Sequence, residues 1–352
     1  MMRTFASCKF FFILLFGLGS FYSEKLLAEF QKDYVPVALY LTWQKDPTTT
    51  MTVQWLSTLQ DEDDDIEFYE ISKEVPKEIQ WKMKKGEHSQ VPEDHPFLVH
   101  KTLIEDLTPD TDYCFRFGKS DKEYRFRTMP KELKAPIVFC AGGDTYNSKF
   151  KYLYNTNVQA AKQNPRFVLI GGDIAYAAPA LKTQKEDFSR WLLWLKCWSD
   201  TMITSDGFLI PLICAIGNHE VKGGFDQTPD EALLFYSFFA MPGPQGYNAL
   251  HFGSYLGITI LDSGHTHPIA GEQSSWLDKE LKTQSNLTHR FAIYHVPAYP
   301  SVRFFRSTYP SSIRRNWVPL FERHKLHVAF ENHDHSYKRT FPLINGDPDP
   351  SG

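Results

Sequence analysis

Residues 167–176 read FVLIGGDIAY, and this stretch decides the fold of the second half of the chain. Its first four residues form an apolar run short enough for a buried strand. The glycines that follow let the backbone turn sharply, so that Asp173 faces the crevice beyond the strand end. Similar apolar runs lead to four more polar positions: Asp144, Asn218, His295 and His333. Because loops past the carboxyl ends of strands converge in α/β folds, we expect these side chains to meet.

The region around this stretch alternates between strand-like and helix-like patterns from about residue 135 onward. This alternation predicts an α/β domain with layered sheets over residues 135–352. Apolar runs occur at 136–140, 167–170, 209–215, 255–261, 291–294 and 327–330, and helical patterns at 152–163, 187–201, 232–240, 274–282 and 314–323. The turn-rich end after Asn345 predicts that the sequence is a truncated chain whose domain continues beyond residue 352.

The preceding region, residues 33–130, shows short β-branched or aromatic strands bounded by turn residues, which predicts an all-β sandwich. The strands are expected at 37–43, 50–56, 66–71, 98–104, 113–117 and 123–127. Residues 107–113 resemble the tyrosine corner of such sandwiches, and with Trp55 they indicate a fibronectin type III-like domain. The acidic run 61–65 is interpreted as a solvated loop, with a calcium site as the alternative. Residues 129–131 read as the linker.

The first 28 residues have the layout of a signal peptide, with Arg3 and Lys9 before the apolar run 10–18. The chain is therefore expected to be secreted or periplasmic, with no stable membrane insertion after cleavage; an uncleaved anchor is the alternative. Removal of this segment changes the formal net charge from −4 to −6, and no basic stripe indicates nucleic acid. Four cysteines remain, which could form disulfides or stay as buried thiols: Cys114, Cys140, Cys197 and Cys214.

The polar residues at the strand ends form a motif series: GD at Asp144, GDxxY from Asp173 to Tyr176, GNHE at Asn218, a strand-borne His295, and HxHxY at His333 and His335. In this order the series resembles the purple acid phosphatase branch of the calcineurin-like metallophosphoesterases. The preceding sandwich is similar to that of the larger members. The resemblance implies a four-layer α/β/β/α catalytic domain and an acid phosphatase that hydrolyses phosphate monoesters through a metal-bound hydroxide.

The resemblance also implies a binuclear metal centre of Fe(III) and a divalent iron, zinc or manganese ion. The iron site would use Asp144, Asp173, Tyr176 and His335, and the divalent site would use Asp173, Asn218, His295 and His333. Hard carboxylate and phenolate oxygens suit a ferric ion, whereas imidazole and amide ligands suit the divalent ions. His219 is the candidate general acid and phosphate ligand, and Arg303 is a candidate phosphate ligand. The expected partner is a small phosphoester; a homodimer stays open beside a monomer.

Five positions depart from the family pattern: Tyr146 and Asn332 stand where glycine is usual, Lys338 replaces a glutamate, and Phe304 and Phe305 replace histidines of the plant-type members. None removes a metal ligand, but the phenylalanines leave substrate preference open. A diesterase or nucleotide hydrolase is therefore one alternative, and a metal-bound binding protein with weak catalysis is another. Taken singly, each candidate ligand would more often be a helix cap, a turn residue or a core side chain.

Overall fold

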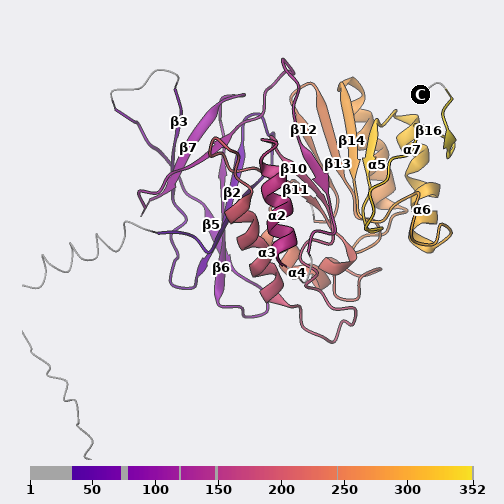
Figure 1. Ribbon diagram of the computed structural model, residues 1–352, viewed down its shortest axis with the longest axis horizontal. Helices are drawn as coiled ribbons and strands as arrows, with labels where there is room; N and C mark the ends of the chain where they lie inside the picture. The colour runs from indigo at the N-terminus through magenta and orange to yellow at the C-terminus, as the bar shows by residue number, and fades with distance from the viewer. Residues whose placement is uncertain (1–33, 73–77, 119, 147–149, 244, 351–352) are drawn as a thin grey trace, which may run out of the picture.

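The structure is a computed structural model that describes residues 34–72, 78–118, 120–146, 150–243 and 245–350 (Figure 1). The predicted signal peptide lies outside these residues. Within the described part of the chain, no helix is long and apolar enough to cross a membrane. The four cysteines after the predicted signal are all free thiols, and Cys114, Cys197 and Cys214 are buried.

The N-terminal part is a sandwich of two antiparallel sheets, as the sequence predicted. The first sheet has the order β1 (Ala38–Thr42), β2 (Met51–Thr58), β6 (Phe97–Ile104), β5 (Glu87–Gln90). The second has the order β4 (Lys82–Lys84), β3 (Ile66–Glu70), β7 (Asp112–Phe117), β8 (Tyr124–Arg127). Trp55, Phe115 and Phe117 are fully buried between the sheets, and each contributes roughly 1.5–3 kcal/mol through burial.

The predicted tyrosine corner is present. The backbone N–H of Thr108 donates to the Tyr113 hydroxyl at 2.8 Å. This bond fixes the turn between β6 and β7 across the end of the sandwich.

The second part contains two further sheets. The three-stranded sheet is parallel and has the order β11 (Leu212–Ala215), β10 (Val168–Gly171), β9 (Cys140–Gly142). The four-stranded sheet has the order β12 (Asn248–Phe252), β13 (Leu256–Ile260), β14 (His289–Ile293), β15 (Val328–Phe330), and only β12 runs antiparallel to its neighbour.

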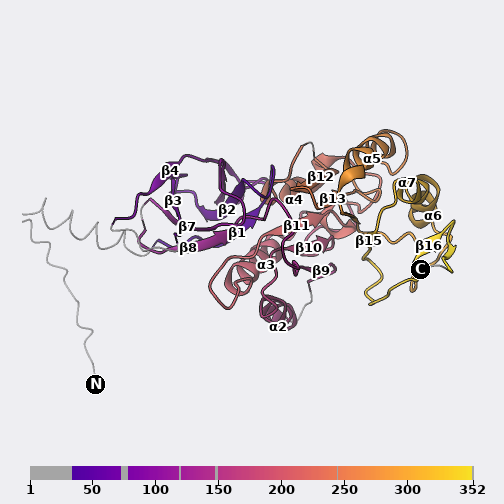
Figure 2. The same cartoon turned by 90° about the horizontal axis from the view of Figure 1, so that it is seen from above.

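Helices cover the outer faces of these sheets and complete four layers (Figure 2). On one side lie α2 (Phe150–Ala161) and α3 (Phe188–Thr201), whose buried residues share one core with Val168, Ile170 and Leu212. On the other lie α5 (Glu272–Thr283), α6 (Thr308–Asn316) and α7 (Val318–Arg323), which share a core with Ala292. A third core between the sheets continues into the sandwich. The predicted α/β/β/α arrangement is confirmed.

Several elements differ from the sequence-based expectation. The helix expected at 314–323 is two helices, because Pro319 cannot donate a backbone hydrogen bond to the preceding turn. The helix expected at 232–240 is shorter, with a 3₁₀ turn (Pro229–Ala232) leading into α4 (Leu233–Phe238). Another 3₁₀ turn (Gln284–Asn286) follows α5. Near the end, Asn345 and Gly346 form the turn of a hairpin between β16 (Leu343–Ile344) and β17 (Asp347–Pro348).

The sandwich and the α/β part meet along β1 and β2. The Tyr40 hydroxyl donates to the carbonyl of Phe238 at 2.7 Å, and the Gln54 amide donates to the same carbonyl at 3.0 Å. Lys222 adds an ion pair with Glu93 at 3.1 Å, only two residues after the buried Glu220. These contacts hold the sandwich against the side of the domain that carries the strand-end motifs.

Candidate metal centre

The predicted site residues gather where parallel strands end. Asp144 follows β9, Asp173 follows β10, and Asn218 opens the short 3₁₀ turn (Asn218–Glu220) that follows β11. From the other sheet, His295 follows β14, and His333 and His335 follow β15. The site therefore lies where the carboxyl ends of both sheets face one another, as the strand-end argument predicted.

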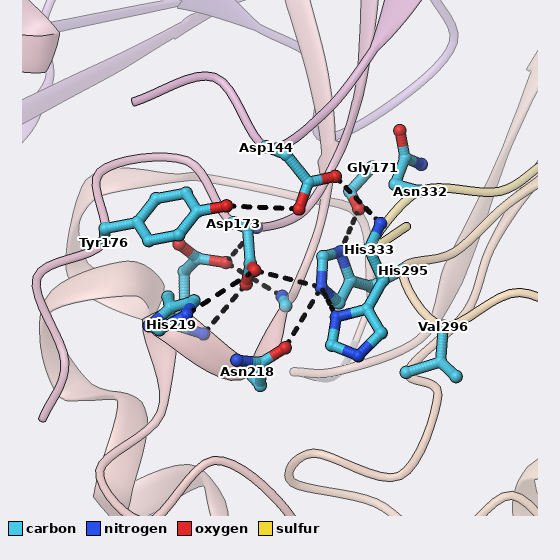
Figure 3. Close-up of polar contacts among 12 residues, drawn as sticks. Asp144, Gly171, Asp173, Tyr176, Asn218, His219, His295, Val296, Asn332 and His333 are labelled. Atoms are coloured by element: carbon cyan, nitrogen blue, oxygen red, sulfur yellow. Dashed lines mark hydrogen bonds and ion pairs between the residues drawn. The ribbon is translucent and has the colours of Figure 1, made fainter. Parts of the chain in front are cut away.

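His295 is the hub of one half of the site (Figure 3). It is fully buried, and its Nδ1–H donates to the carbonyl of Gly171 at 2.8 Å. With Nδ1–H held there, Nε2 faces the centre. Burial alone would lower the pKa of His295, but the carboxylates of Asp173 and Asp144 raise it to about 9. Without a cation Nε2 therefore carries a proton, and a bound cation would take the place of that proton. Around Nε2 lie Asp173 Oδ2 at 3.2 Å, Asn218 Oδ1 at 3.2 Å and His333 Nδ1 at 2.9 Å. Four potential ligand atoms thus meet at one point.

Asp173 lies between the two halves of the site. Its side chain is almost fully buried, and Oδ1 accepts the backbone N–H of His219 at 2.9 Å. Burial alone would raise the pKa of Asp173, but the charge of His295 and hydrogen bonds from His295 and His219 lower it well below its ordinary value. The carboxylate therefore stays ionised and can attract a cation on either side.

Asp144, Tyr176 and His335 form the other half. The Tyr176 hydroxyl donates to Asp144 Oδ1 at 3.2 Å and lies 3.0 Å from His335 Nε2. His335 Nε2 is 3.1 Å from the same carboxylate oxygen. Burial and the carboxylates of Asp173 and Asp144 raise the pKa of Tyr176. The phenol therefore keeps its proton near neutral pH unless a cation binds at its oxygen.

The backbone at the site is strained. Asp144, Asp173, Tyr176, His333 and His335 all have positive φ between 50° and 68°, although none is glycine. Such conformations are uncommon for residues with a side chain and persist only where the surrounding structure enforces them. Five of the seven predicted ligands therefore adopt a backbone conformation that most residues avoid and that clusters at functional sites.

Glycines allow the strand ends to approach one another closely. A Cβ on Gly172, which has a φ of +85°, would lie 2.7 Å from the backbone nitrogen of Gly217 and 2.9 Å from His295 Nδ1. A Cβ on Gly171 would lie 1.6 Å from the Asn332 amide nitrogen. Asn332, which departs from the family pattern, thus covers Gly171 at the end of β10 and Gly143 after β9, and it occupies no ligand position.

Sequence analysis missed two carboxylates that organise the site. Glu220 is fully buried and accepts backbone N–H groups from Asp173 at 2.7 Å, Ile174 at 2.7 Å and Gly217 at 2.9 Å. Burial and the Asp173 carboxylate raise the pKa of Glu220 to about 8. Asp334 accepts the backbone N–H groups of Ser301 and Val302 at 2.6 and 3.0 Å and so holds that loop beside His333.

The two predicted substrate-facing residues lie at the edge of the site. The His219 ring stacks on Tyr176 with ring centroids 4.2 Å apart, and 42% of its side chain is exposed. The Arg303 guanidinium donates to the carbonyl of His333 at 3.1 and 3.2 Å and keeps 48% of its side chain exposed. Phe304 is 74% exposed and adds an apolar surface on the same loop.

The donor chemistry fits two cations. Two groups, Asp173 with His295 and His333, and Asp144 with Asp173 and His335, each bring ligand atoms within 4.8 Å of one another, and both include Asp173. Asn218 adds an amide oxygen to the first group and Tyr176 a phenol oxygen to the second. Burial, with the nearby charges of His295 and Arg303, lowers the pKa of His333 to about 3, so its imidazole stays neutral as a metal ligand must.

Comparison with known families agrees with this geometry. Residues 36–128 match the purple acid phosphatase N-terminal domain, and residues 126–337 match the calcineurin-like phosphoesterase domain. The second match covers more than half of the chain and includes every predicted ligand.

Curated relatives are similar over most of this chain. Purple acid phosphatase 18 of Arabidopsis thaliana is 24% identical over 72% of this chain and 56% of its own length. Purple acid phosphatase 1 of Ipomoea batatas and Fe(3+)-Zn(2+) purple acid phosphatase 12 of Arabidopsis thaliana are each 26% identical over 70% of this chain and 53% of their own length. The chain thus spans about half the length of these relatives. The matches show that the chain belongs to the calcineurin-like phosphoesterase family and carries a purple acid phosphatase N-terminal domain.

Proposed function

We propose that this protein is an exported acid phosphatase that hydrolyses phosphate monoesters at a binuclear metal centre. The observation that carries the proposal is the meeting of seven metal-capable side chains from both sheets around the shared carboxylate of Asp173. Similarity to relatives named as purple acid phosphatases supports the same activity.

The two donor sets favour different cations. Asp144, Asp173, Tyr176 and His335 would hold Fe(III), because carboxylate and phenolate oxygens suit a hard ion. Asp173, Asn218, His295 and His333 would hold a divalent iron, zinc or manganese ion, which imidazole and amide groups suit. When bound, the two ions would polarise a phosphate ester and lower the pKa of bound water.

The remaining chemistry falls to residues at the rim. His219 is half-exposed beside Asp173, so its imidazole can bind a phosphate oxygen and protonate the departing alkoxide. Burial lowers the pKa of His219, while the Asp173 carboxylate opposes this change. Arg303, anchored on the His333 carbonyl, would grip a further phosphate oxygen. Glu220 and Asp334 position the loops that carry these groups.

Export rests on the sequence of residues 1–28, which has the charged start and short apolar run of a signal peptide. Expression of the full chain with determination of the N-terminal residue of the product tests this part. A mature protein that begins between residues 24 and 29 supports export, and an intact N-terminus in the cytoplasm contradicts it.

Hydrolysis itself is tested with p-nitrophenyl phosphate and bis(p-nitrophenyl) phosphate on the metal-loaded chain. We expect the monoester to be the better substrate, and Asp173→Asn to lower kcat/KM by at least about 100-fold, more than loss of an outer partner costs. Asp200→Asn is the matched control, because Asp200 is half-exposed and pairs with Lys196 on the surface of α3. A clear preference for the diester would show that the substrates are phosphodiesters and not monoesters. No turnover of either ester by the metal-loaded protein would refute the proposed activity.

A further inference from the structure

A second group of metal-capable side chains lies in the sandwich, away from the centre described above. Asp64, His88 and His100 each offer a ligand atom, and these atoms lie within 4.8 Å of one another. His100 Nδ1 is 2.6 Å from Asp64 Oδ1, and His88 Nδ1 is 2.9 Å from Asp64 Oδ2. The two histidines face each other directly across the β5–β6 pair, so both imidazoles point Nδ1 at one carboxylate.

The position of His100 is fixed by its neighbours. Its ring is fully buried and stacks on Trp55 with centroids 4.6 Å apart and planes only 6° from parallel. Ser57 Oγ lies 2.6 Å from His100 Nε2, and the same hydroxyl lies 3.1 Å from the carbonyl of Thr58. When Nε2–H donates to Ser57 and Ser57 donates to Thr58, Nδ1 and Asp64 Oδ1 both present electron pairs to the same space, which a cation would fill. A metal-bound histidine typically has such an oxygen partner on its other nitrogen.

We propose that Asp64, His88 and His100 bind one divalent cation of the zinc class and that this cation links the two sheets of the sandwich. Two imidazole nitrogens and a carboxylate oxygen are ligands for zinc rather than for calcium or magnesium, which prefer oxygen. Ligand atoms around tetrahedral zinc lie about 3.3 Å apart, which small rotations of these side chains can reach.

Burial and solvent access also suit this assignment. The His88 side chain is 28% exposed, so a cation can enter from this side and a water molecule can complete its coordination. The run 61–65 was interpreted as a solvated loop, but Asp64 is only 8% exposed and points inward between the sheets.

The cation would cross-link the two sheets of the sandwich. Asp64 lies just before β3 of one sheet, whereas His88 and His100 belong to β5 and β6 of the other. Binding to the folded form alone raises stability by mass action, so zinc should raise the melting temperature of the sandwich. This cation site is independent of the proposed phosphatase activity.

The test is zinc binding to the full chain after removal of all metals, followed by determination of zinc per chain at equilibrium. His88→Gln, a change at a partly exposed side chain, should lose one equivalent of zinc and keep the rest. His251→Gln is the matched control, because His251 also pairs with a carboxylate, Glu280 at 2.6 Å, but with no second histidine. The catalytic centre contributes equally to all three proteins, so its own zinc occupancy does not affect the comparison.

A second variant separates ligand loss from misfolding. Ser57→Ala keeps all three ligands but removes the hydrogen-bond partner of His100, so zinc affinity at this site should fall about 10- to 100-fold. Zinc should raise the melting temperature more for wild type and His251→Gln than for His88→Gln. Equal zinc content and affinity in wild type, His88→Gln and Ser57→Ala would overturn the proposal.

Discussion

His295 donates its Nδ1–H to the backbone carbonyl of Gly171 at 2.8 Å, and this bond joins the two sheets of the α/β part. Gly171 ends β10 in one sheet, and His295 follows β14 in the other. The bond also fixes which nitrogen of the imidazole faces Asp173. The geometry of the centre is therefore determined by how the two sheets pack together.

Tyr176→Phe tests the ferric half of the centre. The variant keeps the ring that stacks on His219 but removes the oxygen near Asp144 and His335. We expect the visible absorption of the oxidised, iron-loaded protein to disappear, because no tyrosinate remains to bind Fe(III). Tyr146→Phe is the control, since its ring lies 6.3 Å from that of Tyr176. A visible band that survives in Tyr176→Phe would assign the iron another ligand.

His219→Asn tests the proposed acid. Turnover of an alkyl phosphate should fall by about 10²- to 10⁴-fold, because its leaving group needs a proton. Turnover of p-nitrophenyl phosphate should fall much less, because nitrophenolate departs without one. The measurement is kcat for both esters in wild type and variant. An equal loss for the two esters would limit His219 to phosphate binding.

Glu220→Gln tests the buried carboxylate behind the centre. The amide places N–H groups where Asp173, Ile174 and Gly217 already donate, so at least one buried N–H loses its partner. We expect a loss of about 1–3 kcal/mol in the free energy of unfolding and about 10- to 100-fold weaker metal binding. Glu87→Gln, at a side chain that is 71% exposed, is the control. Unchanged metal affinity would show that Glu220 does not support the metal ligands.

Glu186 gives the folded protein a pH dependence away from the centre. Burial, together with the charge of Glu93, raises its pKa from 4.5 to about 7. A raised pKa means that the folded state holds this proton more tightly, so stability falls as pH rises from about 4.5 through 7. The decrease amounts to roughly 3 kcal/mol.

Urea unfolding at pH 5 and pH 8 measures this effect, with Glu186→Gln as the comparison. The variant keeps an oxygen that can accept the Trp191 Nε1–H bond, which is 2.9 Å long in the wild type. It should lose less stability between the two pH values than wild type does. An identical pH dependence in both proteins would show that Glu186 ionises with an ordinary pKa.

The convergence of Asp144, Asp173, Asn218, His295 and His333 could be predicted because each lies at the end of an apolar run, and parallel strands bring these ends together. Tyr176 and His335 were predicted from the family resemblance of the motifs. The layers were predictable because strand-like and helix-like patterns alternate along this half of the chain.

Glu220 was missed because it accepts backbone N–H groups of Asp173 and Ile174, which follow a different strand. Sequence periodicity does not show such backbone contacts. A signal was present, however: an acidic residue stands directly after Asn218 and His219.

Other features depend on contacts that periodicity does not encode. Asp64 belongs to an acidic run that resembles a solvated loop, and only the pairing of β5 with β6 brings His88 and His100 to it. The break between α6 and α7 was predictable from Pro319 alone. The role of Arg303 as a phosphate ligand stays a prediction, because its visible partner is the His333 carbonyl.

Anomalous diffraction from crystals of the metal-loaded protein, recorded at the iron and zinc absorption edges, tests the central claim most directly. We expect two peaks about 3.5–4 Å apart, one on each side of the Asp173 carboxylate. The iron peak should lie next to Tyr176 and the second next to His295 and Asn218. A single peak, or metal ions that leave Asp173 uncoordinated, would contradict a binuclear centre.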